Sequence, residues 1–118
     1  MTQRQEKVGE LLKVEISEII FREMKDPRLG FVTITDVKVT ADLKYARVFV
    51  SIMGDPKQQE MGITALKHAS GFVRGELGKR VRMRVTPEIE FRIDESIEQG
   101  ARIFELLQQI KKDESDKG

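Results

Sequence analysis

Few side chains in this sequence could do catalytic chemistry. The sequence lacks the residue types that most kinds of active site require. The 118 residues include no Cys and one His, His68, which excludes thiolate zinc sites, cysteine nucleophiles and sites built from several histidines. His68 has no Ser or Asp motif near it that would indicate a nucleophilic triad. No glycine-rich phosphate loop follows an expected strand. We therefore expect a protein that is not an enzyme and uses no metal or cofactor.

Positive charge is concentrated in one stretch, although the whole chain is nearly neutral. Lys and Arg number 21 against 20 Asp and Glu, a formal net charge of +1. Between Gly71 and Thr86 five cations and one acid, Glu76, give +4, whereas the residues from Asp94 onward carry −3. The five cations are Arg74, Lys79, Arg80, Arg82 and Arg84.

Three of these arginines alternate with apolar residues. If the run is extended, Arg80, Arg82 and Arg84 share one face with about 6.6 Å between neighbours. Arginine binds phosphate oxygens in a fork geometry, and neutralising several phosphates gives affinity for nucleic acid without sequence reading. The alternative is a solvated charged face, because 35% of the chain is charged. The clustering favours nucleic acid.

Gly71, Gly75 and Gly78 interrupt a helical pattern within eight residues, and glycine costs about 1 kcal/mol relative to alanine inside a helix. We predict a kinked helix pair with its junction at Ala69-Ser70-Gly71. Small residues there would let a ligand backbone approach the free N–H groups of the second helix, which favour phosphate. The alternative is that they only allow close helix packing. The G-x-x-G string that begins at Gly75 lies inside the second helix, unlike the G-x-x-G loop of KH modules.

The rest of the pattern predicts the elements that position these residues. Apolar stripes indicate helices, alternating β-branched residues indicate strands, and Asp55 with Gln58 forms a capping box. In chain order we expect a helix over residues 3–24, strands over 31–40 and 45–53 joined as a hairpin, helices over 57–69 and 72–80, a strand over 88–94 and a last helix after Ser96.

Three strands with helices on one face predict an α+β fold, a two-layer sandwich. We expect one domain over residues 1–110 and a short disordered charged tail over 111–118. The longest apolar runs have three residues, far fewer than the roughly 20 that cross a bilayer, and the N-terminus does not resemble a signal peptide. We therefore expect a soluble cytoplasmic protein without membrane contact, and a monomer.

Six motifs, taken in order, resemble the bacterial ribosome-binding factor A family. They are Asp26-Pro27-Arg28; Val32 to Val37; Asp42-Leu43 with Ala46 and Val48; Ala69-Ser70-Gly71 with Arg74; Pro87-Glu88 with Phe91 and Asp94; and Arg102-Ile103 with Leu106 and Leu107. The resemblance covers about residues 3–110. It implies a type II KH-like fold, α-β-β-α-α-β plus a C-terminal helix, without the G-x-x-G loop and with the Ala-x-Gly junction described above.

The resemblance also implies a function. Such a protein is a non-enzymatic assembly factor that binds the free small (30S) ribosomal subunit and its 16S rRNA and assists late maturation of that RNA, notably in the cold. Ribosome-assembly GTPases are further expected partners. We expect RNA contacts from Ser70, Gly71, Arg74, Lys79, Arg80, Arg82 and Arg84, with Lys67 and Arg28 as weaker candidates and Arg4 and Lys7 weaker still. The alternative is a protein-interaction module that acts through a sheet edge or the acidic C-terminal helix.

Overall fold

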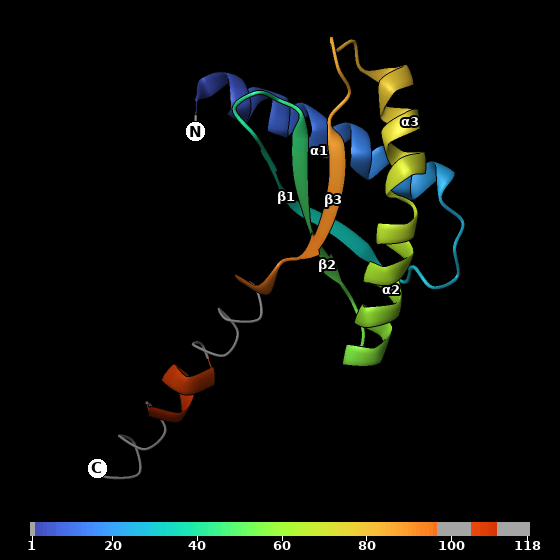
Figure 1. Ribbon diagram of the computed structural model, residues 1–118. Coiled ribbons are helices and arrows are strands. Elements are labelled where there is room, and N and C mark those ends of the chain that lie inside the picture. The colour runs from blue at the N-terminus through green and yellow to red at the C-terminus, as the bar shows by residue number, and fades with distance from the viewer. Residues whose placement is uncertain (1, 97–104, 111–118) are drawn as a thin grey trace.

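The computed structural model describes residues 2–96 and 105–110. The elements are α1 (Gln3–Glu23), β1 (Val32–Val39), β2 (Tyr45–Ile52), α2 (Pro56–His68), α3 (Ser70–Arg80) and β3 (Glu88–Ile93) (Figure 1). Residues 105–110 are helical as well. The predicted tail over 111–118 and residues 97–104 of the predicted last helix lie outside the described residues. Every predicted strand and the first three predicted helices are present, with ends that differ by one or two residues.

The three strands form one sheet in the order β1-β2-β3. β1 and β2 pair antiparallel, with Val39 opposite Ala46, as the short turn between them predicts. β3 pairs with β2 in parallel, with Val48 opposite Phe91. This is possible because α2 and α3 carry the chain back to the starting end of β2 before β3 begins. The α+β prediction is confirmed.

β1 departs from regular alternation at one residue. Ile34 and Val37 are both buried although they are three residues apart. The pairing register shifts between Ile34, which faces Val50, and Asp36, which faces Phe49, so Thr35 is an extra residue in β1. A bulge of this kind returns the following side chains to the buried face. The strand prediction is confirmed, but the regular alternation expected across it is wrong.

The helices cover one face of the sheet, and the core lies between the two layers (Figure 1). Close approach of α1 to β1 requires Gly9, because a Cβ there would lie 2.7 Å from the Val37 carbonyl oxygen. Full burial of each large apolar side chain stabilises the fold by about 1.5–3 kcal/mol. Among the residues that the structure describes, the large apolar side chains with no exposed surface are Leu12, Ile16, Ile19, Val48, Val50, Leu66, Val73 and Leu77.

The uncovered face of the sheet is polar. Arg47 of β2 lies 3.4 Å from a carboxylate oxygen of Glu90 on β3, and Arg92 lies 2.7 Å from the other oxygen. Both arginines lower the pKa of Glu90, and the hydrogen bond from Arg92 is the larger cause. None of the helices in the described ranges combines the length and apolar character that crossing a membrane requires.

α2 and α3 meet at a single residue, Ala69, which caps the end of one helix and the start of the other. The Ala69 N–H donates to the carbonyl oxygens of Ala65 (3.0 Å) and Leu66 (3.1 Å), and its own oxygen accepts from Val73 N–H (2.9 Å). The chain therefore stays close to helical conformation, and α3 follows directly from the end of α2 (Figure 1). The predicted helix pair is confirmed, with the break between the two helices at the first residue of the predicted junction.

Candidate nucleic-acid interface

One exposed side of α3 consists of three glycines and one arginine. Gly71, Arg74, Gly75 and Gly78 are all exposed, and their spacing places them on one side of the helix. A Cβ on Gly71 or Gly75 would meet no atom within 4 Å. Neither glycine is therefore needed for packing within the described chain, and the alternative that Gly71 only relieves helix packing is wrong. The surface beside Gly71, in the first turn of α3, is therefore open to solvent.

Two predicted site residues near this surface already have partners in the fold. The guanidinium of Arg74 donates two hydrogen bonds to the carbonyl oxygen of Thr86, at 3.2 and 3.0 Å, and so holds the loop after α3 against the helix. The Ser70 hydroxyl donates to the carbonyl oxygen of Lys67 at 2.9 Å, in the last turn of α2. The Lys67 side chain lines a shallow hollow between α2 and β3. The structure therefore does not bring Lys67 to the exposed side of α3.

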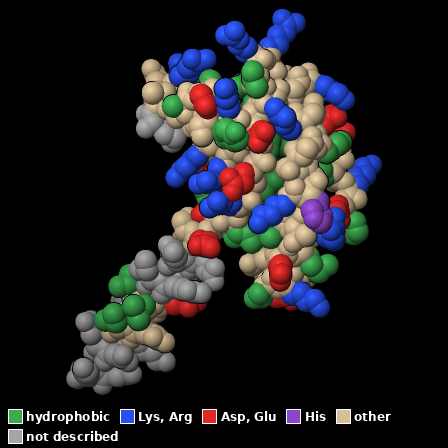
Figure 2. All heavy atoms as spheres, viewed as in Figure 1, with side chains coloured by type: hydrophobic (Ala, Val, Ile, Leu, Met, Phe, Trp, Pro, Cys, Tyr) green, Lys and Arg blue, Asp and Glu red, His purple; other side chains and the backbone are tan. Residues whose placement is uncertain are grey.

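Arg82 and Arg84 lie at a hollow of about 600 Å³ that the sequence did not indicate. It opens between the start of α1, the β1–β2 turn and the loop after α3. We call it the basic hollow. The charged residues among those that line it are Arg4, Lys44, Arg82, Arg84 and one acid, Asp42. Figure 2 shows Lys and Arg side chains gathered at the upper end of the molecule.

The four cations of the basic hollow are free of carboxylate partners among the described residues. The ion pairs in the described part of the chain are made by other cations, namely Arg22, Arg28, Arg47, Lys79, Arg80 and Arg92. Asp42 accepts hydrogen bonds from the Thr40 hydroxyl (2.7 Å) and the Lys44 N–H (3.0 Å), and these bonds lower its pKa. Four positive charges against one negative charge leave the charged part of the lining at +3.

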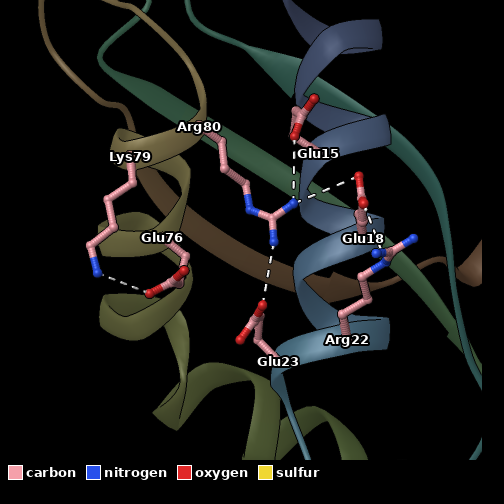
Figure 3. A network of polar contacts seen from close by, with 7 residues as sticks. All are labelled: Glu15, Glu18, Arg22, Glu23, Glu76, Lys79 and Arg80. Atoms are coloured by element: carbon pink, nitrogen blue, oxygen red, sulfur yellow. Dashed lines mark hydrogen bonds and ion pairs between the residues drawn. The ribbon is translucent and has the colours of Figure 1, made fainter.

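Arg80 does not share a face with Arg82 and Arg84. It is the last residue of α3, and its guanidinium reaches across to α1, where it lies 3.8 Å from Glu15, 3.6 Å from Glu18 and 3.5 Å from Glu23 (Figure 3). Its side chain is only 24% exposed. The residues that follow, 81–87, form no strand in the described structure. The prediction of an extended alternating run is therefore wrong. α3 continues through Arg80, and the charge of Arg80 is shared among three carboxylates.

Lys79 and Arg28 take part in local ion pairs. Lys79 lies 3.3 Å from Glu76, one turn earlier on α3, and remains largely exposed, so the pair holds it only weakly. Arg28 binds Asp26 at 2.7 Å. The hydrogen bond from Arg28 lowers the pKa of Asp26 and raises the pKa of Arg28 itself. Asp26 also accepts the backbone N–H of Arg28, so this arginine first of all closes the turn between α1 and β1.

Sequence reasoning missed Lys44 and left Arg4 at the margin. Each stands in a segment of balanced charge, about 40 residues from the next cation of the basic hollow along the chain. Only the packing of the β1–β2 turn between the start of α1 and the loop after α3 brings them together. No local signal in the sequence could have found this arrangement.

Comparison with known proteins gives a consistent result. The sequence model of the family described as Ribosome-binding factor A matches residues 4–107. A ribosome-binding factor A from Halothermothrix orenii is 53% identical over 112 residues, which are 95% of this chain and 92% of that protein.

Solved structures of the same kind share the fold. The crystal structure of ribosome-binding factor A from Thermus thermophilus gives a TM-score of 0.68 at 29% identity, over 75% of this chain and 93% of that one. A homology model of the Thermus thermophilus protein, fitted into a cryo-EM map of a 30S complex, gives 0.62 at 29% identity, over 74% and 91%. The strand order, the helix break at Ala69 and these matches together establish a KH-like fold, and the chain belongs to the ribosome-binding factor A family.

Proposed function

We propose that this chain binds the small ribosomal subunit through its RNA and assists late maturation of 16S rRNA as a non-enzymatic, cytoplasmic assembly factor. The observation that carries the RNA contact is the basic hollow, where four cations without ion-pair partners among the described residues come from three separate segments. The family and the 30S complex of a relative support the choice of the subunit as partner.

The proposed contact has two parts. At one end of α3, the open first turn at Gly71 lets an RNA backbone approach N–H groups that favour phosphate. At the other end, the basic hollow neutralises further phosphates. For single-stranded nucleic acid, each neutralised phosphate contributes about −0.7 to the slope of log affinity against log salt concentration. Four cations acting together therefore give a slope of about −3.

The double variant Arg82→Gln with Arg84→Gln tests the basic hollow. We expect weaker binding to small-subunit RNA and a salt slope flatter by about 1.4, because two phosphate contacts are lost. The measurement is a titration of affinity at several salt concentrations.

A charge-matched control removes two arginines from the polar sheet face, Arg47→Gln with Arg92→Gln. It changes the net charge equally, and these exposed pairs contribute little to stability. We expect its salt slope to match that of the unmodified protein. Equal slopes for the hollow variant and the unmodified protein would show that the RNA contacts lie elsewhere.

A further inference from the structure

A second surface of the molecule is apolar and uncovered. A groove of about 500 Å³ opens between the second half of α1 and the start of β1, which is an edge strand. Two aromatic side chains line it while remaining highly exposed: Phe21 at 87% and Phe31 at 71%. Large exposed apolar patches of this kind mark interaction sites. The groove and the basic hollow have no lining residue in common, and Gly71 does not line the groove, so this surface is separate from the RNA contact proposed above.

The C-terminal helical residues 105–110 have the complementary surface. Leu106 and Leu107 are each 58% exposed and Ile110 is 48% exposed, and their spacing places them on adjoining sides of one helical turn. Most helical stability in proteins comes from packing an apolar face against other residues. The segment therefore needs a surface of the same character.

Residues 105–110 stand apart from the sheet in Figure 1, and the chain before them is fastened to the sheet at Asp94. The Asp94 N–H donates to the Val50 carbonyl oxygen at 2.8 Å. One carboxylate oxygen of Asp94 accepts from the Thr35 hydroxyl at 2.6 Å, and the other accepts the Ser96 N–H at 2.9 Å. The bonds from Ser96 and Thr35 lower the pKa of Asp94. The chain is thus fastened across β2 to the bulge of β1, and the residue before that bulge, Ile34, lines the groove.

Chain length and charge allow the segment to reach the groove. Leu106 follows Ser96 by ten residues, enough chain to span up to about 33 Å. Lys25 lies on the rim of the groove and takes part in none of the ion pairs among the described residues, while Glu105 begins the helical segment. A short tether also gives an effective concentration in the millimolar range, which favours contact within one chain over contact between two.

We propose that residues 105–110 dock in the groove of their own chain, with Leu106, Leu107 and Ile110 against Phe21 and Phe31. Docking covers the apolar surface and the start of the β1 edge, so any protein partner of that edge must first displace the C-terminal segment. This inference does not depend on the proposed RNA contact.

Because the chain has no Cys, one nitroxide label can be placed by Gln109→Cys in the full-length protein. We expect at least twofold loss of NMR peak intensity for the amides of Phe31, Val32 and Thr33, and none for Met61 on α2. Adding Leu107→Asp and Ile110→Asp to the labelled chain should restore the lost intensity, and neither residue belongs to the core.

Full intensity at Phe31, Val32 and Thr33 in the labelled chain overturns the proposal. A second sample mixes labelled protein without isotope enrichment and enriched protein without label. Intensity loss in this sample as large as in the first would mean that a second copy fills the groove, which also overturns docking within one chain.

Discussion

Arg80 and Arg82 are two residues apart and of the same type, yet their side chains lie in different surroundings. Arg80 is shared among Glu15, Glu18 and Glu23 of α1, whereas Arg82 lies at the basic hollow with no carboxylate partner among the described residues. The first fastens α3 to α1, and the second remains available to an anion. Residue type and spacing could not separate these roles, because the three carboxylates come from the other end of the sequence.

Replacing Arg80 tests this division at the level of one side chain. Arg80→Gln leaves three nearby carboxylates without their common cation, so we expect the free energy of unfolding to fall by about 1–2 kcal/mol. The loss should shrink in high salt, which screens the repulsion among the carboxylates. Urea denaturation at low and high salt measures both effects.

The neighbouring Lys79→Gln is the matched control, since its ion pair with Glu76 is exposed. It should change stability by no more than about 0.5 kcal/mol. Equal stability of the two variants would contradict the fastening role of Arg80. An Arg80→Gln protein that is less stable but keeps the RNA salt slope supports it.

At the scale of the element, α3 combines a buried side with an open one. Val73 and Leu77 pack in the core, while Gly71 and Gly75 stand one turn apart with free space where a Cβ would lie. Alanine at either position should stabilise the free protein by up to about 1 kcal/mol, because it is the better helix former. Circular dichroism melting of Gly71→Ala and Gly75→Ala checks this.

The bulkier pair Gly71→Val and Gly75→Val separates the first turn of α3 from the rest of its open side. If an RNA backbone approaches the helix N-terminus, Gly71→Val loses a charge-assisted hydrogen bond, worth about 1.5–3 kcal/mol or roughly tenfold or more in affinity. Gly75→Val should bind normally. Co-sedimentation with small subunits gives the answer, and normal binding by a folded Gly71→Val protein would remove the first turn from the RNA contact.

Local signals in the sequence were sufficient for most elements. The capping box of Asp55 and Gln58 predicted the start of α2, and both of its hydrogen bonds are present at 2.8 Å. The bulge at Thr35 was missed although the spacing of Ile34 and Val37 carries the signal, since two residues three apart cannot share a face of a regular strand.

At the scale of the whole molecule, surface charge follows from topology rather than from composition. The +4 stretch from Gly71 to Thr86 is not one patch. Arg80 turns to α1, Arg74 holds Thr86, and the remaining arginines of the loop join Arg4 and Lys44 at the basic hollow. The concentration of cations between Gly71 and Thr86 could be predicted from the sequence. The location of the basic hollow could not, because the hollow exists only once three distant segments are packed together.

The parallel pairing of β3 also bears on how the chain folds as it is synthesised. β1 and β2 are neighbours in sequence and can pair as soon as they emerge, but the second edge of β2 waits for residues 88–93. Phe91, almost completely buried in the finished protein, is among the last core residues to be made. Until it arrives, α2 and α3 lack the strand beside which they pack, and their apolar side chains stay open to solvent and to other chains.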